Sequence, residues 1–166
     1  MAELKDITTF IFDVDGVLSD GTVIAYATGE QVRRFYVKDG YAIEKALAAG
    51  FHIVIISGGE QESVRKRLQF LGIKDIFLGV KDKLAVFNEY TKTRAIDTNN
   101  ILYMGDDIPD YKMLKLAGLP TCPADAAIDI KPICTYISPF EGGKGAVRDV
   151  IEKVMKAQGK WHPEQW

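Results

Sequence analysis

The sequence predicts an α/β fold of the Rossmann-like three-layer kind, a parallel sheet between helices, with one inserted β-hairpin. Short apolar runs rich in Ile, Val and Phe alternate with longer stretches of helical periodicity, as in strand–helix–strand repeats. One early segment instead alternates with a period of two, which is typical of a hairpin. A chain of 166 residues, 47% of them hydrophobic, is long enough to bury one core, so we expect residues 1–166 to form a single domain.

The apolar runs and the periodic stretches give the expected elements in order. The expected strands are at 8–12, 51–56, 75–78 and 101–104. The expected helices are at 40–49, 60–71, 81–94, 109–117 and 145–157. Gly50, Gly72 and Gly118 each follow an apolar helical stretch, as glycine does where helices end.

Two segments fall outside this alternation. Residues 22–26 and 31–37 alternate by two around Thr28-Gly29, which predicts a hairpin over 22–37. Residues 158–166 carry Gly159 and Pro163 without periodicity, which predicts a C-terminal tail. Because Trp161 and Trp166 would expose apolar surface in a solvated tail, we expect the tail to dock on protein.

Composition and charge exclude several classes of partner. A formal charge of -2 offers no electrostatic support for nucleic-acid binding. Cys122 and Cys134 are not in a CxxC spacing, which favours free core thiols in a reducing compartment. The apolar run before Asp13 spans about five residues, too short for a signal peptide or a membrane span. We therefore expect a cytoplasmic protein without nucleic-acid or membrane partners.

The first expected strand ends in a pair of acids, Asp13 and Asp15. Ligands of open parallel sheets bind beyond the carboxyl ends of the strands, so both carboxyl groups can address one phosphate. Two carboxylates beside a phosphoryl dianion repel it strongly. Such a site therefore needs a divalent cation and a positive side chain.

The ends of the other strands supply these groups. Asp106 and Asp107 follow the fourth strand and offer the hard oxygen ligands that Mg²⁺ prefers. Lys83 offers an ammonium, and residues 57–59 (Ser-Gly-Gly) offer a hydroxyl and backbone N–H groups before a helix. Each feature alone is more often a cap, a turn or a solvated charge. Their order and spacing together favour a phosphate site.

These four motifs resemble those of the haloacid dehalogenase superfamily over the full length of the chain. The hairpin, residues 36–41 and the ending 142–160 are similar to its small branch typified by 3-deoxy-D-manno-octulosonate 8-phosphate phosphatase. The resemblance implies a phosphatase without a large cap domain. It also implies a homotetramer in which hairpins join subunits and the tail of a neighbour, with Lys160 and Trp161, covers the active site.

The resemblance assigns the catalytic roles. Asp13 would be the nucleophile that forms an aspartyl-phosphate, and Asp15 the general acid and base. Ser57 and Lys83 would bind the transferring phosphoryl oxygens. Mg²⁺ would be held by the Asp13 carboxylate, the Asp15 backbone carbonyl and Asp106. Asp107 or Asp110 would orient this shell.

The resemblance also implies a phosphorylated sugar acid as substrate. The implied substrate-binding residues are Asp15, Tyr36, Val37, Lys38, Asp39, Gly40, Gly58, Gly59, Arg67 and Lys83. Arg67 has a competing interpretation as a solvated helix charge. Two departures remove positive charge: many members of the branch carry arginine at the position of Gly59 and near that of Glu44. A phosphatase for the nine-carbon sugar acid 9-phosphate is therefore the alternative, and the Gln158–Lys160 tail favours the eight-carbon substrate.

Two readings without catalysis compete with this one. A receiver domain places its phosphorylated acid on the third strand, but the third strand here ends at 77–79 (Phe-Leu-Gly) without an acid. An oligomerisation module would need only the hairpin, whereas Asp13, Asp15, Lys83 and Asp106 are all intact. Both observations favour the enzyme.

Overall fold

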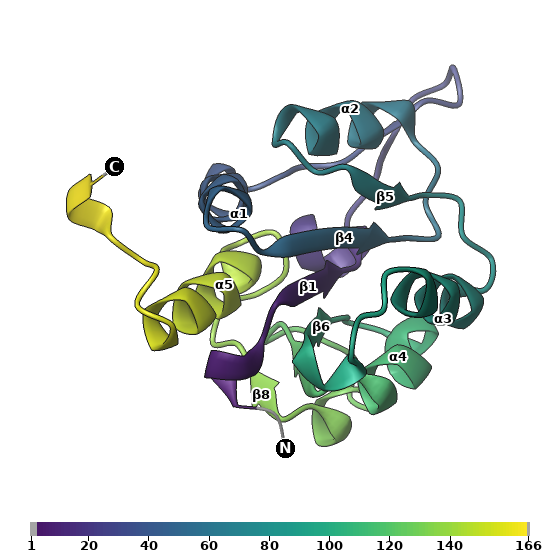
Figure 1. Cartoon of the computed structure of the whole chain (residues 1–166). Coiled ribbons are helices and arrows are strands. Elements are labelled where there is room, and N and C mark those ends of the chain that lie inside the picture. Colours follow the sequence, from purple (N-terminus) through teal and green to yellow (C-terminus); the bar gives the residue numbers. More distant parts are fainter. Residues whose placement is uncertain (1–2, 166) are drawn as a thin grey trace.

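The computed structural model describes residues 3–165, and its centre is a six-stranded parallel sheet in the order β5-β4-β1-β6-β7-β8 (Figure 1). The strands are β1 (Thr9–Phe12), β4 (His52–Ile56), β5 (Asp75–Phe77), β6 (Ile101–Met104), β7 (Leu119–Cys122) and β8 (Tyr136–Ile137). The helices are α1 (Val37–Ala48), α2 (Glu62–Phe70), α3 (Lys83–Thr93), α4 (Tyr111–Leu116) and α5 (Ala146–Ala157). The predicted α/β class with a parallel sheet is confirmed.

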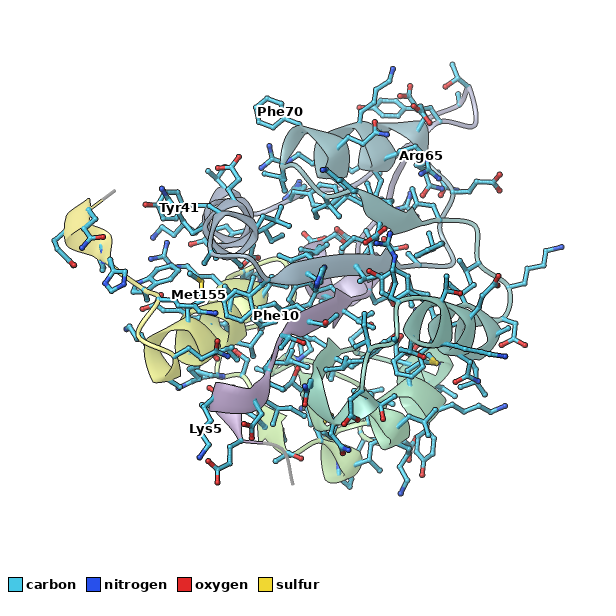
Figure 2. All side chains as sticks on the ribbon, in the orientation of Figure 1. Lys5, Phe10, Tyr41, Arg65, Phe70 and Met155 are labelled. Atoms are coloured by element: carbon cyan, nitrogen blue, oxygen red, sulfur yellow. The ribbon has the colours of Figure 1, made fainter. Side chains whose placement is uncertain are left out.

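Helices cover both faces of the sheet, which gives the three layers (Figure 1). Successive residues of β1 point to opposite faces, so Phe10 and Phe12 pack under α1, α2 and α5. Ile11 packs on the other side, under α3 and α4. Phe10 and Met155 of α5 lie together in the first layer (Figure 2). Burying a side chain of this size contributes about 1.5–3 kcal/mol, so β1 is anchored from both sides.

The sheet has two more strands than the sequence predicts. β7 contains Pro120, which marks a loop more often than a strand, and β8 has only two residues. Both lie on the edge side of β6. Pairing with β6 stabilises β7 despite its composition. The Thr121 hydroxyl adds a hydrogen bond, which it donates to the Tyr103 carbonyl at 2.9 Å.

The hairpin is shorter than predicted. Its strands are β2 (Ile24–Ala25) and β3 (Gln31–Val32), and they pair antiparallel. The expected continuation to Val37 is wrong, because Val37 begins α1 and is 74% exposed. Phe35 packs against the core and forms an isolated β-bridge with Ser19. The apolar residues at 35 and 37 therefore fit the pattern of a strand without belonging to one.

The tail leaves α5 and extends from the domain (Figure 1). The Gln158 side chain donates to the Leu4 and Ile7 carbonyls at 3.1 and 2.7 Å. Trp161 packs partly against the core, with the Arg148 guanidinium 5.3 Å from its ring centroid. A single turn follows at Pro163–Gln165, and Trp166 lies outside the described residues. Within residues 3–165, no helix combines the length and apolar character needed to cross a membrane.

Candidate active site

The segments that follow β1, β4, β5 and β6 meet at a cavity of about 1000 Å³. It lies beyond the carboxyl ends of β1 and its neighbours β4 and β6, where the chain changes direction across the sheet. The sequence-predicted residues that line it are Asp13, Asp15, Ser57, Gly58, Gly59, Lys83 and Asp106. The structure therefore brings all four motifs together in one place.

Asp13 is fixed by hydrogen bonds to both carboxylate oxygens. Its Oδ1 accepts from the Val14 backbone N–H at 2.6 Å, and its Oδ2 lies 2.8 Å from Lys83 Nζ. Lys83 is the first residue of α3, which begins there because the Asp82 side chain caps the helix by accepting from the Ala85 N–H. This cap aims the Lys83 ammonium at the residue that follows β1.

Lys83 stays charged although it is only 8% exposed. Burial acts to lower its pKa, but the carboxylates of Asp13 and Asp110 outweigh burial and raise the pKa. Nζ donates to Asp110 Oδ1 at 2.9 Å as well as to Asp13. The ammonium is thus available at neutral pH to offset negative charge in the cavity.

The buried Asp110 carboxylate links several groups of the site through hydrogen bonds. Its Oδ1 also accepts from the Tyr103 hydroxyl at 2.7 Å, and its Oδ2 accepts from the Asp106 backbone N–H at 3.3 Å. Asp107 is exposed and accepts from the Ile108 N–H. Of the two acids that the sequence left open for the orienting role, the geometry favours Asp110.

Three carboxyl groups gather where a metal ion is expected. Single carboxylate oxygens of Asp13, Asp106 and Asp110 lie within 4.8 Å of one another. Burial, followed by the neighbouring carboxylates, raises the pKa of Asp13 to about 6 and that of Asp106 to about 7. Because Lys83 brings a single positive charge to three acids, the cluster fits a divalent cation with oxygen ligands. Mg²⁺ therefore suits the residues present.

Gly16 allows Asp106 to reach the loop after β1. A Cβ at Gly16 would lie 2.0 Å from Asp106 Oδ2, and the residue has a φ of 79° that only glycine adopts readily. The same loop is packed from the other side by the chain before α5. Gly143 N–H donates to the Val17 carbonyl at 2.9 Å, and a Cβ at Gly142 would lie 1.9 Å from the Gly16 oxygen. Gly142 and Gly143, which begin the segment 142–160, thus support the loop that carries Asp13 and Asp15.

The Ser57–Gly59 loop forms the opposite wall of the cavity. Ser57 is buried, and its hydroxyl accepts from the Gly59 N–H at 3.4 Å. The loop is tied to the segment after β5, because the N–H of Gly79 donates to the Gly59 carbonyl at 2.8 Å. α2 begins at Glu62, later than predicted, so residues 57–61 form a loop, of which residues 57–59 line the cavity.

Asp15 has a partner that the sequence analysis missed. Arg33, just after β3, donates from Nε to Asp15 Oδ1 at 2.9 Å and from Nη2 to Oδ2 at 3.3 Å. The Arg33 side chain is 6% exposed, and that of Asp15 is 38% exposed. The adjacent basic residues Arg33 and Arg34 were the available signal, but nothing in the spacing pairs either with Asp15.

Apart from Gly58 and Gly59, the predicted sugar-side residues do not line the cavity of this chain. Tyr36 and Lys38 line a separate cavity of about 470 Å³ beside α5. The Arg67 guanidinium lies 5.7 Å from the ring centroid of Phe70. Phe70 is 76% exposed at the outer surface of α2 (Figure 2). An added Cβ on Gly40 would lie 2.9 Å from Arg67 Nη2, so these two residues are neighbours.

Asp39 is buried rather than open to a ligand. It is 1% exposed, and its Oδ1 accepts from the Arg148 N–H at the start of α5 at 2.8 Å. Its Oδ2 has no hydrogen-bond partner within residues 3–165. Burial raises the pKa of Asp39 to about 6. In this structure the side chain joins α1 to α5, which is a structural role.

Known proteins are similar to this chain in sequence and in fold. A model of the haloacid dehalogenase-like hydrolase family matches residues 72–151. The 3-deoxy-D-manno-octulosonate 8-phosphate phosphatase of Escherichia coli (strain B / BL21-DE3) is 38% identical over 160 residues, which cover 96% of this chain and 85% of that protein. The crystal structure of the phosphatase of that name from Yersinia pestis has a TM-score of 0.92 and 34% identity, over 95% of this chain and 85% of the other.

A third relative was solved with ligands. The 3-deoxy-D-manno-octulosonate 8-phosphate phosphatase of Moraxella catarrhalis, in complex with a magnesium ion, a phosphate ion and a KDO molecule, has a TM-score of 0.91 and 36% identity. The match covers 94% of this chain and 90% of that one. With these relatives similar over nearly their whole length, the chain belongs to the haloacid dehalogenase-like hydrolases, in the family of the 3-deoxy-D-manno-octulosonate 8-phosphate phosphatases.

Proposed function

We propose that the protein is a magnesium-dependent phosphatase that hydrolyses 3-deoxy-D-manno-octulosonate 8-phosphate to the free sugar acid and phosphate, in lipopolysaccharide precursor synthesis. The observation that carries the proposal is the Asp13 carboxylate, held 2.8 Å from the buried Lys83 ammonium beside Asp106. The names of the relatives supply the substrate.

In the first step, an Asp13 carboxylate oxygen attacks phosphorus and the bond from phosphorus to the sugar oxygen breaks. Asp15 gives its proton to the departing oxygen, so the sugar acid leaves as an alcohol. Lys83 and the Ser57 hydroxyl bind the phosphoryl oxygens and offset their charge in line with attack. Asp13 then carries the phosphoryl group as an acyl phosphate.

In the second step, water attacks the same phosphorus and Asp15 takes a proton from it. The bond from phosphorus to Asp13 breaks, which restores the carboxylate and releases phosphate. The Asp13 carboxylate, the Asp15 backbone carbonyl and Asp106 would hold Mg²⁺, which supplies positive charge at the phosphoryl oxygens when bound. Asp110 keeps Lys83 and the Asp106 backbone in place through both steps.

The sugar side of the site is proposed to be completed by a second subunit of a homotetramer. The implied sugar contacts (residues 36–40, Gly58, Gly59 and Arg67) are divided in one chain, because only the two glycines line the cavity. The hairpin exposes Val23, Ile24 and Tyr26, which is apolar surface suited to subunit contact. Sedimentation of the purified protein tests the assembly, and a monomer with full activity would contradict it.

The nine-carbon sugar acid 9-phosphate is the second candidate substrate. Gly59 favours it, because an added Cβ there would lie 3.5 Å from Asp15 Oδ2, beside the reacting group. The departure in charge from the octulosonate branch therefore falls within the cavity. A cytoplasmic location is part of the proposal, since Cys122 and Cys134 are both free thiols.

The test is phosphate release from both sugar-acid phosphates, with Mg²⁺ and then with a chelator. We expect the eight-carbon ester to give the higher kcat/KM and the chelator to abolish turnover. Asp13→Asn should lower kcat by about 10⁴-fold or more, while the exposed control Asp129→Asn should match the wild type. A faster nine-carbon ester would reassign the substrate, and no release from either ester would favour the oligomerisation module.

A further inference from the structure

The hairpin segment reaches the chemistry of its own subunit through Arg33. Two nitrogens of its guanidinium face the two oxygens of Asp15, at 2.9 Å for Nε to Oδ1 and 3.3 Å for Nη2 to Oδ2. A planar fork of this kind fixes the direction of a carboxylate as well as its position. Asp15 lines the cavity, whereas the Arg33 side chain is 6% exposed behind it.

The two Asp15 oxygens are held unequally. Oδ1 makes the shorter contact, and Oδ2 makes the longer one at 3.3 Å. Oδ2 is also the oxygen turned toward the phosphate-binding loop, because an added Cβ on Gly59 would lie 3.5 Å from it. Oδ1 is thus the more closely held atom, and Oδ2, which makes the longer contact with Nη2, is the oxygen nearer the phosphate-binding loop.

Arg33 is itself held in place from two directions. Its Nη1 donates to the Gln31 side-chain oxygen at 3.2 Å in the preceding strand. After it, Phe35 bridges to Ser19, which lies on the same loop as Asp15. The neighbouring Arg34 is exposed. The backbone that carries the guanidinium is therefore fixed by pairing on both sides, in β3 and at the bridge to Ser19.

From this geometry we infer that Arg33 is a positioning residue for Asp15: it anchors Oδ1 and leaves Oδ2 directed at the reacting oxygen. The inference rests on the proposed phosphatase function. The fork holds the carboxylate with two bonds and the protonated acid with one. A carboxylate accepts both bonds, and after Oδ2 takes a proton Oδ1 still accepts from Nε. Asp15 can thus alternate between acid and base without changing direction.

The competing explanation is that Arg33 only holds the hairpin in place. Substrates with different leaving groups distinguish these two explanations. A sugar alkoxide needs the Asp15 proton in order to leave, whereas p-nitrophenolate leaves without one. A positioning role therefore predicts a larger loss on the sugar ester than on p-nitrophenyl phosphate. With the aryl ester, the second step still needs Asp15 as base, so it should become limiting.

The experiment compares Arg33→Met, Arg33→Lys and the control Arg34→Met, all with Mg²⁺. For Arg33→Met we expect kcat on the sugar-acid phosphate to fall by about 100-fold. On p-nitrophenyl phosphate we expect a smaller fall and a burst of one nitrophenolate per enzyme. Arg33→Lys keeps the charge without the fork and should lie between Arg33→Met and the wild type, and Arg34→Met should resemble the wild type.

Equal losses on both esters without a burst, or no loss in either Arg33 variant, would overturn the inference. If Arg33→Met fails to fold, Arg33→Lys gives the same comparison of leaving groups. A wild-type enzyme that hydrolyses neither ester would instead refute the proposed function. If it hydrolyses another sugar phosphate, the substrate assignment fails while the ratio to the aryl ester still tests Arg33.

Discussion

The phosphate end of the site and its sugar side differ in how completely one chain builds them. Asp13, Ser57, Lys83 and Asp106 come from four strand ends and line one cavity. The proposed sugar contacts at 36–40 and Arg67 lie elsewhere on the same chain, and Asp39 is fully buried. The chemical step therefore depends on sheet topology within a subunit. We propose that recognition of the sugar acid also needs a neighbouring subunit.

The largest effect should follow from removing the charge that holds the phosphate end together. Lys83→Met leaves Asp13 and Asp110 as unpaired buried carboxylates, so we expect kcat to fall by about 10³-fold. The free energy of unfolding of the metal-free protein should fall by about 3–5 kcal/mol. Denaturant titration and steady-state kinetics measure both. Lys92→Met, at the exposed last turn of α3, is the matched control. Unchanged kinetics in Lys83→Met would show that the phosphate end does not depend on this network.

The next effect concerns Mg²⁺ and pH. The folded-state pKa values of Asp13 and Asp106 are raised to about 6 and about 7 from 3.8. Without metal, these two acids therefore contribute stability that is fully present below pH 3.8 and is lost as pH rises from there through about 6 for Asp13 and about 7 for Asp106. Mg²⁺ needs their charged forms, so its apparent affinity should rise at least about tenfold between pH 5 and pH 8.

Thermal unfolding with and without Mg²⁺ at the two pH values measures this difference. Asp39 has a raised pKa too, but it lies away from the metal cluster and contributes equally to both arms. Stabilisation by Mg²⁺ that is independent of pH would indicate that Asp13 and Asp106 do not hold the ion.

The C-terminal tail tests the sugar side of the site. Deletion of residues 160–166 keeps the Gln158 contacts with Leu4 and Ile7 but removes Trp161 from Arg148. If the tail covers a neighbouring site, KM for the sugar-acid phosphate should rise by about tenfold, equivalent to 1.4 kcal/mol. Turnover of p-nitrophenyl phosphate should not change, because the phosphate end is complete without it. An unchanged KM for the sugar ester would remove the tail from recognition.

The smallest effect is expected at Gly59. Its nearest contact for an added Cβ is the flexible Gln61 side chain at 3.0 Å, and its φ is not positive, so Gly59→Arg should fold normally. A partly exposed charge pair contributes up to about 1 kcal/mol, so KM for the eight-carbon keto acid should fall about two- to fivefold. The ratio of kcat/KM for the two sugar-acid phosphates measures the change. A ratio that moves toward the nine-carbon ester would contradict our view of this position.

The same division explains what could be predicted from the sequence. Strand-end motifs are visible because apolar runs locate the strands and parallel topology brings their ends together. The sequence therefore predicts that Asp13, Ser57, Lys83 and Asp106 lie close together, and all four line one cavity. The choice between Asp107 and Asp110 was not visible, because both follow β6 in one turn. Only packing buries Asp110 against Tyr103.

The sequence pattern does not predict contacts between irregular segments that are far apart in the chain. Arg33 meets Asp15 across 18 positions in the chain, through a hairpin whose end was misplaced because Phe35 and Val37 imitate a strand. β7 and β8 were missed because Pro120 and a two-residue strand carry little local signal. Each of these features depends on tertiary contacts, which override local propensity.

Mass spectrometry of rapidly quenched enzyme most directly tests whether the Asp13 side chain carries the phosphoryl group. With Mg²⁺ and the sugar-acid phosphate, we predict one acid-stable phosphoryl group on the peptide containing Asp13, formed within a turnover and absent from Asp13→Asn. A phosphoryl group on another residue, or wild-type turnover without any phosphorylated enzyme, would contradict the account.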